Sequence, residues 1–164
     1  NFVGCLILSV IFVLAGASGT ADYYAGFIGN KLSIPAGEMF FRAILCNFFV
    51  CLAVACGMKC KNEVAKFFMI ILCISGFVVA GFEHCVANMF YIPAGILASL
   101  NPAYVAKAEE AYGITAEQIA TLTPLHSLAN FIPVTLGNML GGMIFVGLPL
   151  YLIYKKNWET KKRT

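Results

Sequence analysis

The chain has 164 residues, of which 60% are hydrophobic and only 12% are charged, and its net charge is +3. An ordinary soluble domain is roughly 25% charged, and so few charges cannot cover the surface of a soluble protein of this size. The composition therefore excludes a soluble domain and indicates an all-α integral membrane protein. The small positive excess gives no reason to expect nucleic acid as a partner.

The first predicted membrane crossing covers residues 1–19, which carry no charged side chain. A run of about 18 apolar residues is long enough to cross a hydrocarbon core of roughly 30 Å as a helix. The run lacks an initiating Met and the basic start of a signal peptide, so we expect a sequence truncated at its amino end. A polar loop that contains Lys31 is expected to follow over residues 20–36.

The second predicted crossing covers residues 37–58 and begins near a charged pair. Glu38 and Arg42 lie four residues apart, a spacing at which opposite charges meet on one face of a helix. We expect this pair at the membrane interface. A short basic turn over residues 59–66 then leads to the third crossing.

The third predicted crossing, residues 67–100, is too long and too polar in its middle to be one simple helix. Glu83, His84 and Asn88 interrupt its apolar sequence. Charged and amide groups at the bilayer centre are costly unless they face a cavity or partners. Irregular backbone at that depth is tolerated only where protein or water satisfies its polar groups. We therefore predict two half-helices around a break near residues 81–88.

The segment that follows the third crossing predicts short helices of its own, lying on the membrane surface. Asn101 and Pro102 fit the N-cap and the first residue of one such helix, which Gly113 would end. Thr115 and Gln118 have the spacing of a capping box for one further turn.

The fourth predicted crossing covers residues 127–154, and residues 155–164 form a tail. Gly137 and Gly141 in this crossing have the GxxxG spacing, which predicts close helix packing. Eight Lys and Arg residues lie in the 59–66 turn and the tail, against three on the other side. The positive-inside rule therefore places the carboxy terminus in the cytoplasm of a multi-pass protein of the inner or plasma membrane.

His84 is the first candidate for chemistry, because an ionisable group inside a membrane is a functional hypothesis by default. Histidine titrates near neutrality, so His84 can take up a proton as an anion arrives and pass that proton on. The alternative is a structural histidine bonded to a carbonyl. Glu83 is adjacent and points elsewhere on a helix, so we assign it to structural support of the broken backbone.

Several other residues have both a functional and a structural interpretation. Lys31 can attract an anion or be an ordinary solvated lysine whose stem lies on apolar surface. Asn47 and Asn138 lie in apolar helices, where each can line a pore or form a hydrogen bond between helices. Phe77 and Val50, taken alone, are typical of packing residues.

The sequence argues against an enzyme and predicts no metal or cofactor. Its seven cysteines form no CxxC pair, whereas zinc and iron–sulfur sites use closely spaced ligands. Glu83, His84 and Cys85 are consecutive, so they cannot all converge on one metal. No set of nucleophile, base and orienting residue is visible. Transport is therefore preferred, with a membrane-embedded redox or structural subunit as the alternative from a different class.

Three blocks of sequence resemble the formate/nitrite transporter family. The stretch Gly-Phe-Glu-His-Cys-Val-Ala-Asn-Met over residues 81–89 is similar to the break in the family's fifth helix. Residues 46–53 resemble its fourth helix, and residues 132–138 resemble the start of its sixth. The four predicted crossings would then be helices three to six of six, and residues 1–164 would form one partial transmembrane domain. The family's first two helices, which carry the other half of the pore wall, would be absent.

The resemblance implies an aquaporin-like helical bundle, a homopentamer, and a pore in each protomer. It implies proton-coupled passage of a small monovalent anion or its weak acid. Formate is the preferred substrate, with nitrite and hydrosulfide as alternatives. By the same resemblance His84 is the pore histidine and proton relay, Lys31 attracts the anion, and the remaining pore-lining or constriction residues are Phe77, Val50, Asn47 and Asn138.

Overall fold

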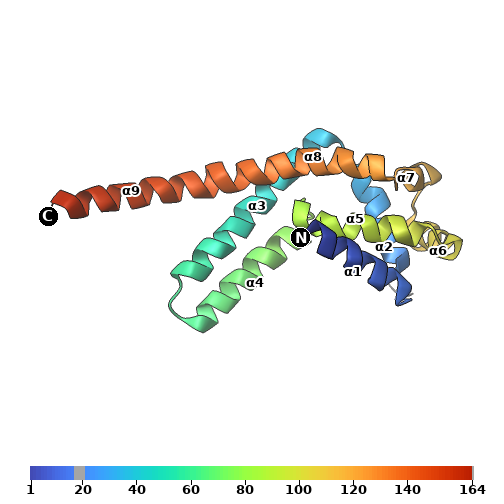
Figure 1. Ribbon diagram of the computed structural model, residues 1–164, viewed down its shortest axis with the longest axis horizontal. Coiled ribbons are helices and arrows are strands. Elements are labelled where there is room, and N and C mark those ends of the chain that lie inside the picture. The colour runs from blue at the N-terminus through green and yellow to red at the C-terminus, as the bar shows by residue number, and fades with distance from the viewer. Residues whose placement is uncertain (17–20, 164) are drawn as a thin grey trace. The chain divides into compact units, whose positions relative to one another are not determined.

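The computed structural model of the chain describes residues 1–16 and 21–163, with side chains described for residues 1–16 and 23–156. The described part consists of helices and short connections and has no strand (Figure 1), which confirms the predicted all-α class. The helices are α1 (Phe2–Leu14), α2 (Ala21–Leu32), α3 (Ala36–Lys59), α4 (Glu63–Val79), α5 (Cys85–Ser99), α6 (Pro102–Tyr112), α7 (Ala116–Ala120), α8 (Pro124–Leu140) and α9 (Leu148–Arg163), with a π-helical segment at Gly141–Gly147. The end of the first predicted crossing, at residues 17–19, and the last tail residue lie outside the described residues.

The chain divides into two compact units. The first unit comprises residues 1–38 and 85–132, and the second comprises residues 39–84 and 133–164. Each unit therefore joins two segments that are distant in the sequence, and one of the boundaries between the units falls directly after His84.

In the first unit, α1 and α2 both pack against α5. The hydroxyl of Ser9 on α1 donates to the carbonyl of Phe90 on α5 at 3.0 Å. A Cβ atom on Gly95 of α5 would lie 2.7 Å from the side chain of Ile28 on α2, so a glycine is required for this close approach. The core of this unit is an apolar cluster of Ile28, Leu32, Ile92 and Leu122.

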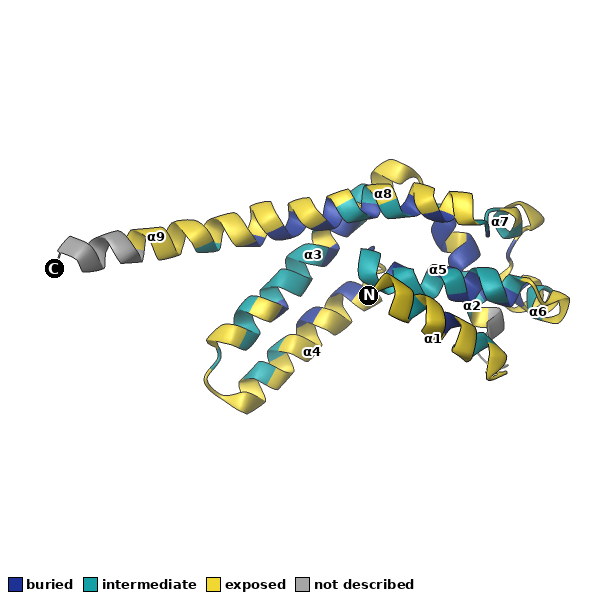
Figure 2. Ribbon diagram, viewed as in Figure 1, coloured by how far each residue is buried: buried dark blue, intermediate teal, exposed yellow. Residues whose placement is uncertain are grey.

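The prediction of a polar loop over residues 20–36 is wrong, because residues Ala21–Leu32 form the helix α2. Its apolar residues Ala25, Ile28 and Leu32 recur three and four positions apart and are all buried. This spacing creates one apolar stripe along the helix. Figure 2 shows the dark blue of buried residues on part of α2. Contacts with α5 and α6 stabilise the stripe, and such tertiary packing is the usual source of helix stability in proteins.

The short helices predicted after the third crossing are confirmed together with their caps. The side chain of Asn101 accepts a hydrogen bond from the backbone at the start of α6, and Gly113 ends that helix in the left-handed conformation, with φ 63°. Thr115 and Gln118 form the reciprocal capping box that begins α7. Local sequence therefore determines both helices.

Among the described residues, α3, with 24 residues, and the continuous helix Pro124–Lys156, with 33, are long and apolar enough to cross a membrane. A third candidate is the pair α5 and α6, which bend by 110° as a broken span or a re-entrant loop. Helix α1 is apolar but has only 13 described residues. Two of the predicted crossings thus have a matching helix, and the boundaries of all four stay predictions.

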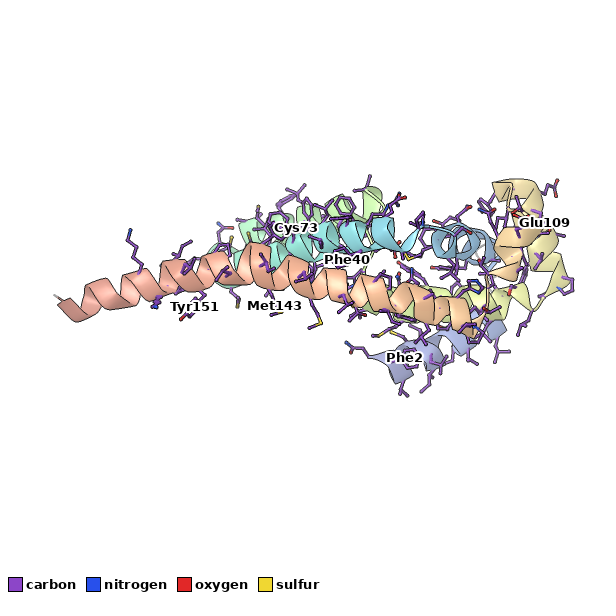
Figure 3. All side chains as sticks on the ribbon, turned by 90° about the horizontal axis from the view of Figure 1, so that it is seen from above. Phe2, Phe40, Cys73, Glu109, Met143 and Tyr151 are labelled. Carbon is purple, nitrogen blue, oxygen red and sulfur yellow. The ribbon has the colours of Figure 1, made fainter. Side chains whose placement is uncertain are left out.

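Large apolar side chains cover much of the outer surface of the described helices. Met143 and Tyr151, labelled on the carboxy-terminal helix in Figure 3, are 63% and 60% exposed. Phe67 and Leu72 on α4 are 61% and 64% exposed. Exposed apolar surface on this scale is typical of helices that face lipid or a protein partner.

The second unit confirms the close packing predicted from Gly137 and Gly141. A Cβ atom on Gly137 would overlap the carbonyl oxygen of Phe40 and lie 2.7 Å from the Cβ of Ala43 on α3. A Cβ atom on Gly141 would overlap the carbonyl oxygen of Ile44. The carboxy-terminal helix and α3 therefore lie backbone to backbone along the stripe formed by Gly137 and Gly141.

Replacing Gly141 by alanine is expected to destabilise the protein by about 1–3 kcal/mol, because the added methyl group has no space against α3. Thermal unfolding of the purified protein in detergent measures the change. Gly37→Ala is the matched control, since a Cβ atom there would meet nothing within 4 Å. Equal melting temperatures for the two variants would contradict the packing described here.

Candidate functional site

The predicted break in the third crossing is present, but it is shorter than expected. Helix α4 ends at Val79 and α5 begins at Cys85, so the break covers residues 80–84 and not 81–88. Residues 85–88 form the first turn of α5 instead. Gly81 has a φ of +67°, a left-handed conformation that glycine adopts without a steric penalty. His84 is the last residue of the break.

The backbone N–H groups of the break fold back onto the end of α4. The N–H of Gly81 donates to the carbonyl of Val78 at 3.1 Å, and that of Phe82 donates to the carbonyl of Phe77 at 3.1 Å. These bonds satisfy two carbonyl groups that the carboxy-terminal end of α4 would otherwise leave open. The carbonyl groups of the break then need donors from other helices.

Asn138 on α8 supplies one such donor. Its side-chain amide donates to the carbonyl of Glu83 at 2.9 Å and to the carbonyl of Ala43 on α3 at 2.8 Å. Asn47 on α3 donates in turn to the backbone carbonyl of Asn138 at 2.6 Å. Both asparagines thus form hydrogen bonds between helices, which is the structural one of the two interpretations given from the sequence. Asn138 is only 4% exposed, as expected for an amide that links three segments.

Glu83 is 1% exposed, and its backbone carbonyl is the one that Asn138 holds. A buried carboxylate is stable only with hydrogen-bonding or charged partners, and Glu83 has interactions beyond those named here. This placement agrees with a supporting role at the break, which stays a prediction.

Arg42 on α3 is a participant that the sequence analysis placed only at the membrane interface. Its Nη1 donates to the carbonyl of Gly81 at 3.3 Å. The signal that points to it is a permanent cation inside a helix that, apart from Asn47, is otherwise apolar from Met39 to Met58. Such a residue requires a polar partner in a membrane.

Two of the predicted site residues, His84 and Phe77, lie against each other. Their ring centroids are 5.8 Å apart with an interplanar angle of 36°. Phe77 is 8% exposed, whereas His84 is half-buried. The imidazole thus has one aromatic wall and remains partly accessible. Val50 is half-buried on α3, and no described contact joins it to His84.

Lys31 belongs to the first unit, in the last turn of α2. It is only 8% exposed, and its Nζ lies 5.4 Å from the centroid of the Phe27 ring. A cation over an aromatic face is attracted by the ring's electron density. The side chain is thus packed in the protein and not solvated, and its role in attracting an anion stays a prediction.

A second pair of asparagines in the first unit was not singled out from the sequence. The side-chain amide of Asn88 on α5 donates to Oδ1 of Asn130 on α8 at 2.9 Å, and both residues are 1% exposed. The sequence signal is an amide within each of two apolar segments, one of them four residues after His84. The pair fixes the first turn of α5 against α8.

Comparison with known proteins gives a family match over most of the chain. The family model described as "Formate/nitrite transporter" matches residues 1–152. This range includes the break and each residue discussed above as a site candidate.

Curated relatives with similar sequences are named formate channels or transporters. The chain is 37% identical over 156 residues to the formate channel FocA of Haemophilus influenzae, covering 90% of this chain and 54% of that protein. It is 35% identical over 160 residues to FocA of Escherichia coli K12, covering 94% and 55%. It is 37% identical over 174 residues to a probable formate transporter of Methanothermobacter thermautotrophicus, covering 95% and 56%. The chain thus spans about half the length of these relatives.

Two solved structures resemble the fold. A pentameric formate channel with formate bound has a TM-score of 0.78 and 34% identity, and the match covers 94% of this chain and 62% of that one. An ion channel of the FNT family has a TM-score of 0.70 and 27% identity, covering 93% and 55%.

Replacing Asn138 by alanine is expected to destabilise the protein by about 1–3 kcal/mol, because the carbonyls of Glu83 and Ala43 lose their donor. Thermal or denaturant unfolding in detergent measures the loss. Met139→Ala is the control, since Met139 is the adjacent residue and is 53% exposed. If both variants lose the same stability, Asn138 does not hold the break.

Proposed function

Because the chain belongs to the formate/nitrite transporter family, we propose that the protein is a membrane channel or transporter for a small monovalent anion or its weak acid. The observation that carries this proposal is the family match over residues 1–152, which includes the break at residues 80–84 and its histidine. The relatives are named as channels or transporters and not as enzymes.

We propose formate as the substrate. Its support is the name of the relatives at 35–37% identity and the formate bound in the pentameric channel that the fold resembles. Nitrite and hydrosulfide are the competing substrates, because both are small, monovalent and weakly acidic. The same resemblance supports a homopentamer, and the distribution of lysines supports a cytoplasmic carboxy terminus.

In the proposed mechanism, Lys31 attracts the anion and His84 handles the proton. Coulomb attraction between Lys31 and the anion strengthens as the effective dielectric constant falls near the protein. The approaching negative charge favours a proton on His84 or on the anion itself. The neutral acid then passes the apolar constriction formed by Phe77 and Val50, since a neutral species crosses apolar surroundings at far lower cost than an anion.

The two asparagines have a supporting part in this mechanism. Asn47 and Asn138 are proposed to form the wall beside the break, where their amides join α3 to α8. Asn138 and Glu83 keep the backbone before His84 in place. The contact of the tilted His84 ring with the ring of Phe77 then presents the imidazole at the constriction.

Replacing His84 by asparagine is expected to lower formate uptake at acidic pH by about a hundredfold or more, the lower end of the effects for a lost proton-transfer group. Radiolabelled formate uptake into proteoliposomes that contain the full-length protein, from about pH 5 to about pH 8, measures this. His126→Asn is the matched control, because His126 is the chain's other histidine and is bonded to Thr123 at an exposed helix start.

Three outcomes of the uptake measurement have different meanings. Unchanged pH-dependent uptake in the His84 variant contradicts the proton relay but leaves the channel in place. Transport of hydrosulfide or nitrite without formate contradicts only the substrate. A folded protein that moves none of the three anions contradicts the proposed function.

Replacing Lys31 by glutamine is expected to raise the KM for formate by roughly three- to tenfold with little change in maximal rate, because a charge that attracts the anion from solution acts on its capture. Added salt should reduce the difference between variant and parent. Lys107→Gln is the control, since Lys107 is an exposed lysine of the same unit. An unchanged KM for Lys31→Gln would contradict its role.

A further inference from the structure

Arg42 carries a permanent charge and contacts the backbone of the break. It lies in α3, is half-buried, and its Nη1 reaches the carbonyl of Gly81 at 3.3 Å. Gly81 is the turning point of the break, with its φ of +67°. A hydrogen bond from a charged donor is roughly twice as strong as one between neutral groups.

The break is held at Gly81 by α3 and at Glu83 by Asn138 of α8. Arg42 binds the carbonyl of Gly81 at the start. Ala43, the next residue of α3, has its carbonyl bound to the same Asn138 amide that holds Glu83 at the other end. The backbone between these two points is short, so fixing Gly81 and Glu83 leaves the peptide before His84 little freedom.

We propose that Arg42 is a positioning residue for His84, acting through the carbonyl of Gly81. This inference rests on the proposed function of His84 and adds a residue that acts without touching the anion. Arginine suits the role because its guanidinium stays charged at any physiological pH and carries five N–H donors. One donor can hold Gly81 while others serve further contacts of the same side chain.

The consequence is that loosening this contact affects proton coupling before it affects anion capture. A side chain displaced by about 1 Å from its productive position can lose up to a hundredfold in rate. Loss of a donor at the break leaves the charge of Lys31 in place, so the attraction of the anion by Lys31 should be unchanged.

The test compares Arg42→Met with Arg42→Lys in the full-length protein in proteoliposomes. Methionine has a similar reach but no donor, whereas lysine keeps both charge and donors. We expect Arg42→Met to lower the maximal rate of formate uptake per folded protein by roughly tenfold with an unchanged KM. The ratio of uptake at about pH 5 to uptake at about pH 8 should fall towards that of His84→Asn. Arg42→Lys should stay within about threefold of the parent.

A pH ratio separates positioning from simple loss of folded protein, because fewer active molecules lower uptake equally at both pH values. Hydrogen exchange of the amides at residues 80–84, measured on the folded fraction, gives a second readout that does not need transport. Exchange should increase in Arg42→Met and stay near the parent in Arg42→Lys. Phe41→Leu is the control, since Phe41 is the preceding residue and is 66% exposed.

Arg42→Met with the parent's pH ratio and the parent's exchange at the break would overturn the proposal, while a loss of uptake in His84→Asn would still support the proposed function. A parent protein that moves no anion would overturn the proposed function. In that case increased exchange in Arg42→Met would still support the part of the proposal that concerns the break, and unchanged exchange would overturn it.

Discussion

A helix that stops leaves backbone donors and acceptors without partners in the helix, and the second unit is arranged around satisfying such groups at residues 80–84. The N–H groups of the break return to α4, while its carbonyls are held by Asn138 and Arg42. In hydrocarbon each unsatisfied group costs several kcal/mol. The break is therefore stabilised by side chains of α3 and α8 that donate hydrogen bonds to its carbonyl groups.

The two glycines of the GxxxG stripe, Gly137 and Gly141, allow the Asn138 side chain to reach these carbonyls. Gly137 directly precedes Asn138, and Gly141 lies one turn further along, both against the backbone of α3. Because no Cβ atom separates the helices there, the short asparagine side chain reaches the carbonyls of Ala43 and Glu83 together. Close helix packing and the hydrogen bonds at the break thus depend on each other.

This arrangement explains how one segment can carry both an irregular backbone and a titratable side chain. His84 follows the held carbonyl of Glu83 and lies on Phe77, which belongs to the regular part of α4. The histidine is therefore attached to a rigid frame although it lies outside any helix. A site that moves a proton benefits from such a frame, because proton transfer requires donor and acceptor within hydrogen-bond reach.

The sequence by itself determined the helical membrane class, the family resemblance that the comparisons confirm, the presence of a break, the caps of α6 and α7, and the close packing at Gly137. Each of these follows from composition, from a motif, or from signals within a few residues. It also indicated His84, because an ionisable group in an apolar segment is conspicuous. It did not reveal α2, since the polarity of residues 20–36 conceals an apolar stripe whose stability comes from α5 and α6.

Only the tertiary structure decided what the polar side chains within the apolar helices bind. Asn138 donates to the carbonyls of Glu83 and Ala43, which are separated from it by 55 and 95 positions in the sequence. Arg42 donates to the carbonyl of Gly81, which is 39 positions away. No local pattern encodes such partners, because they are selected by the approach of helices that are distant in the sequence. The sequence shows that these polar groups need hydrogen-bond partners, and only the folded chain determines which atoms those partners are.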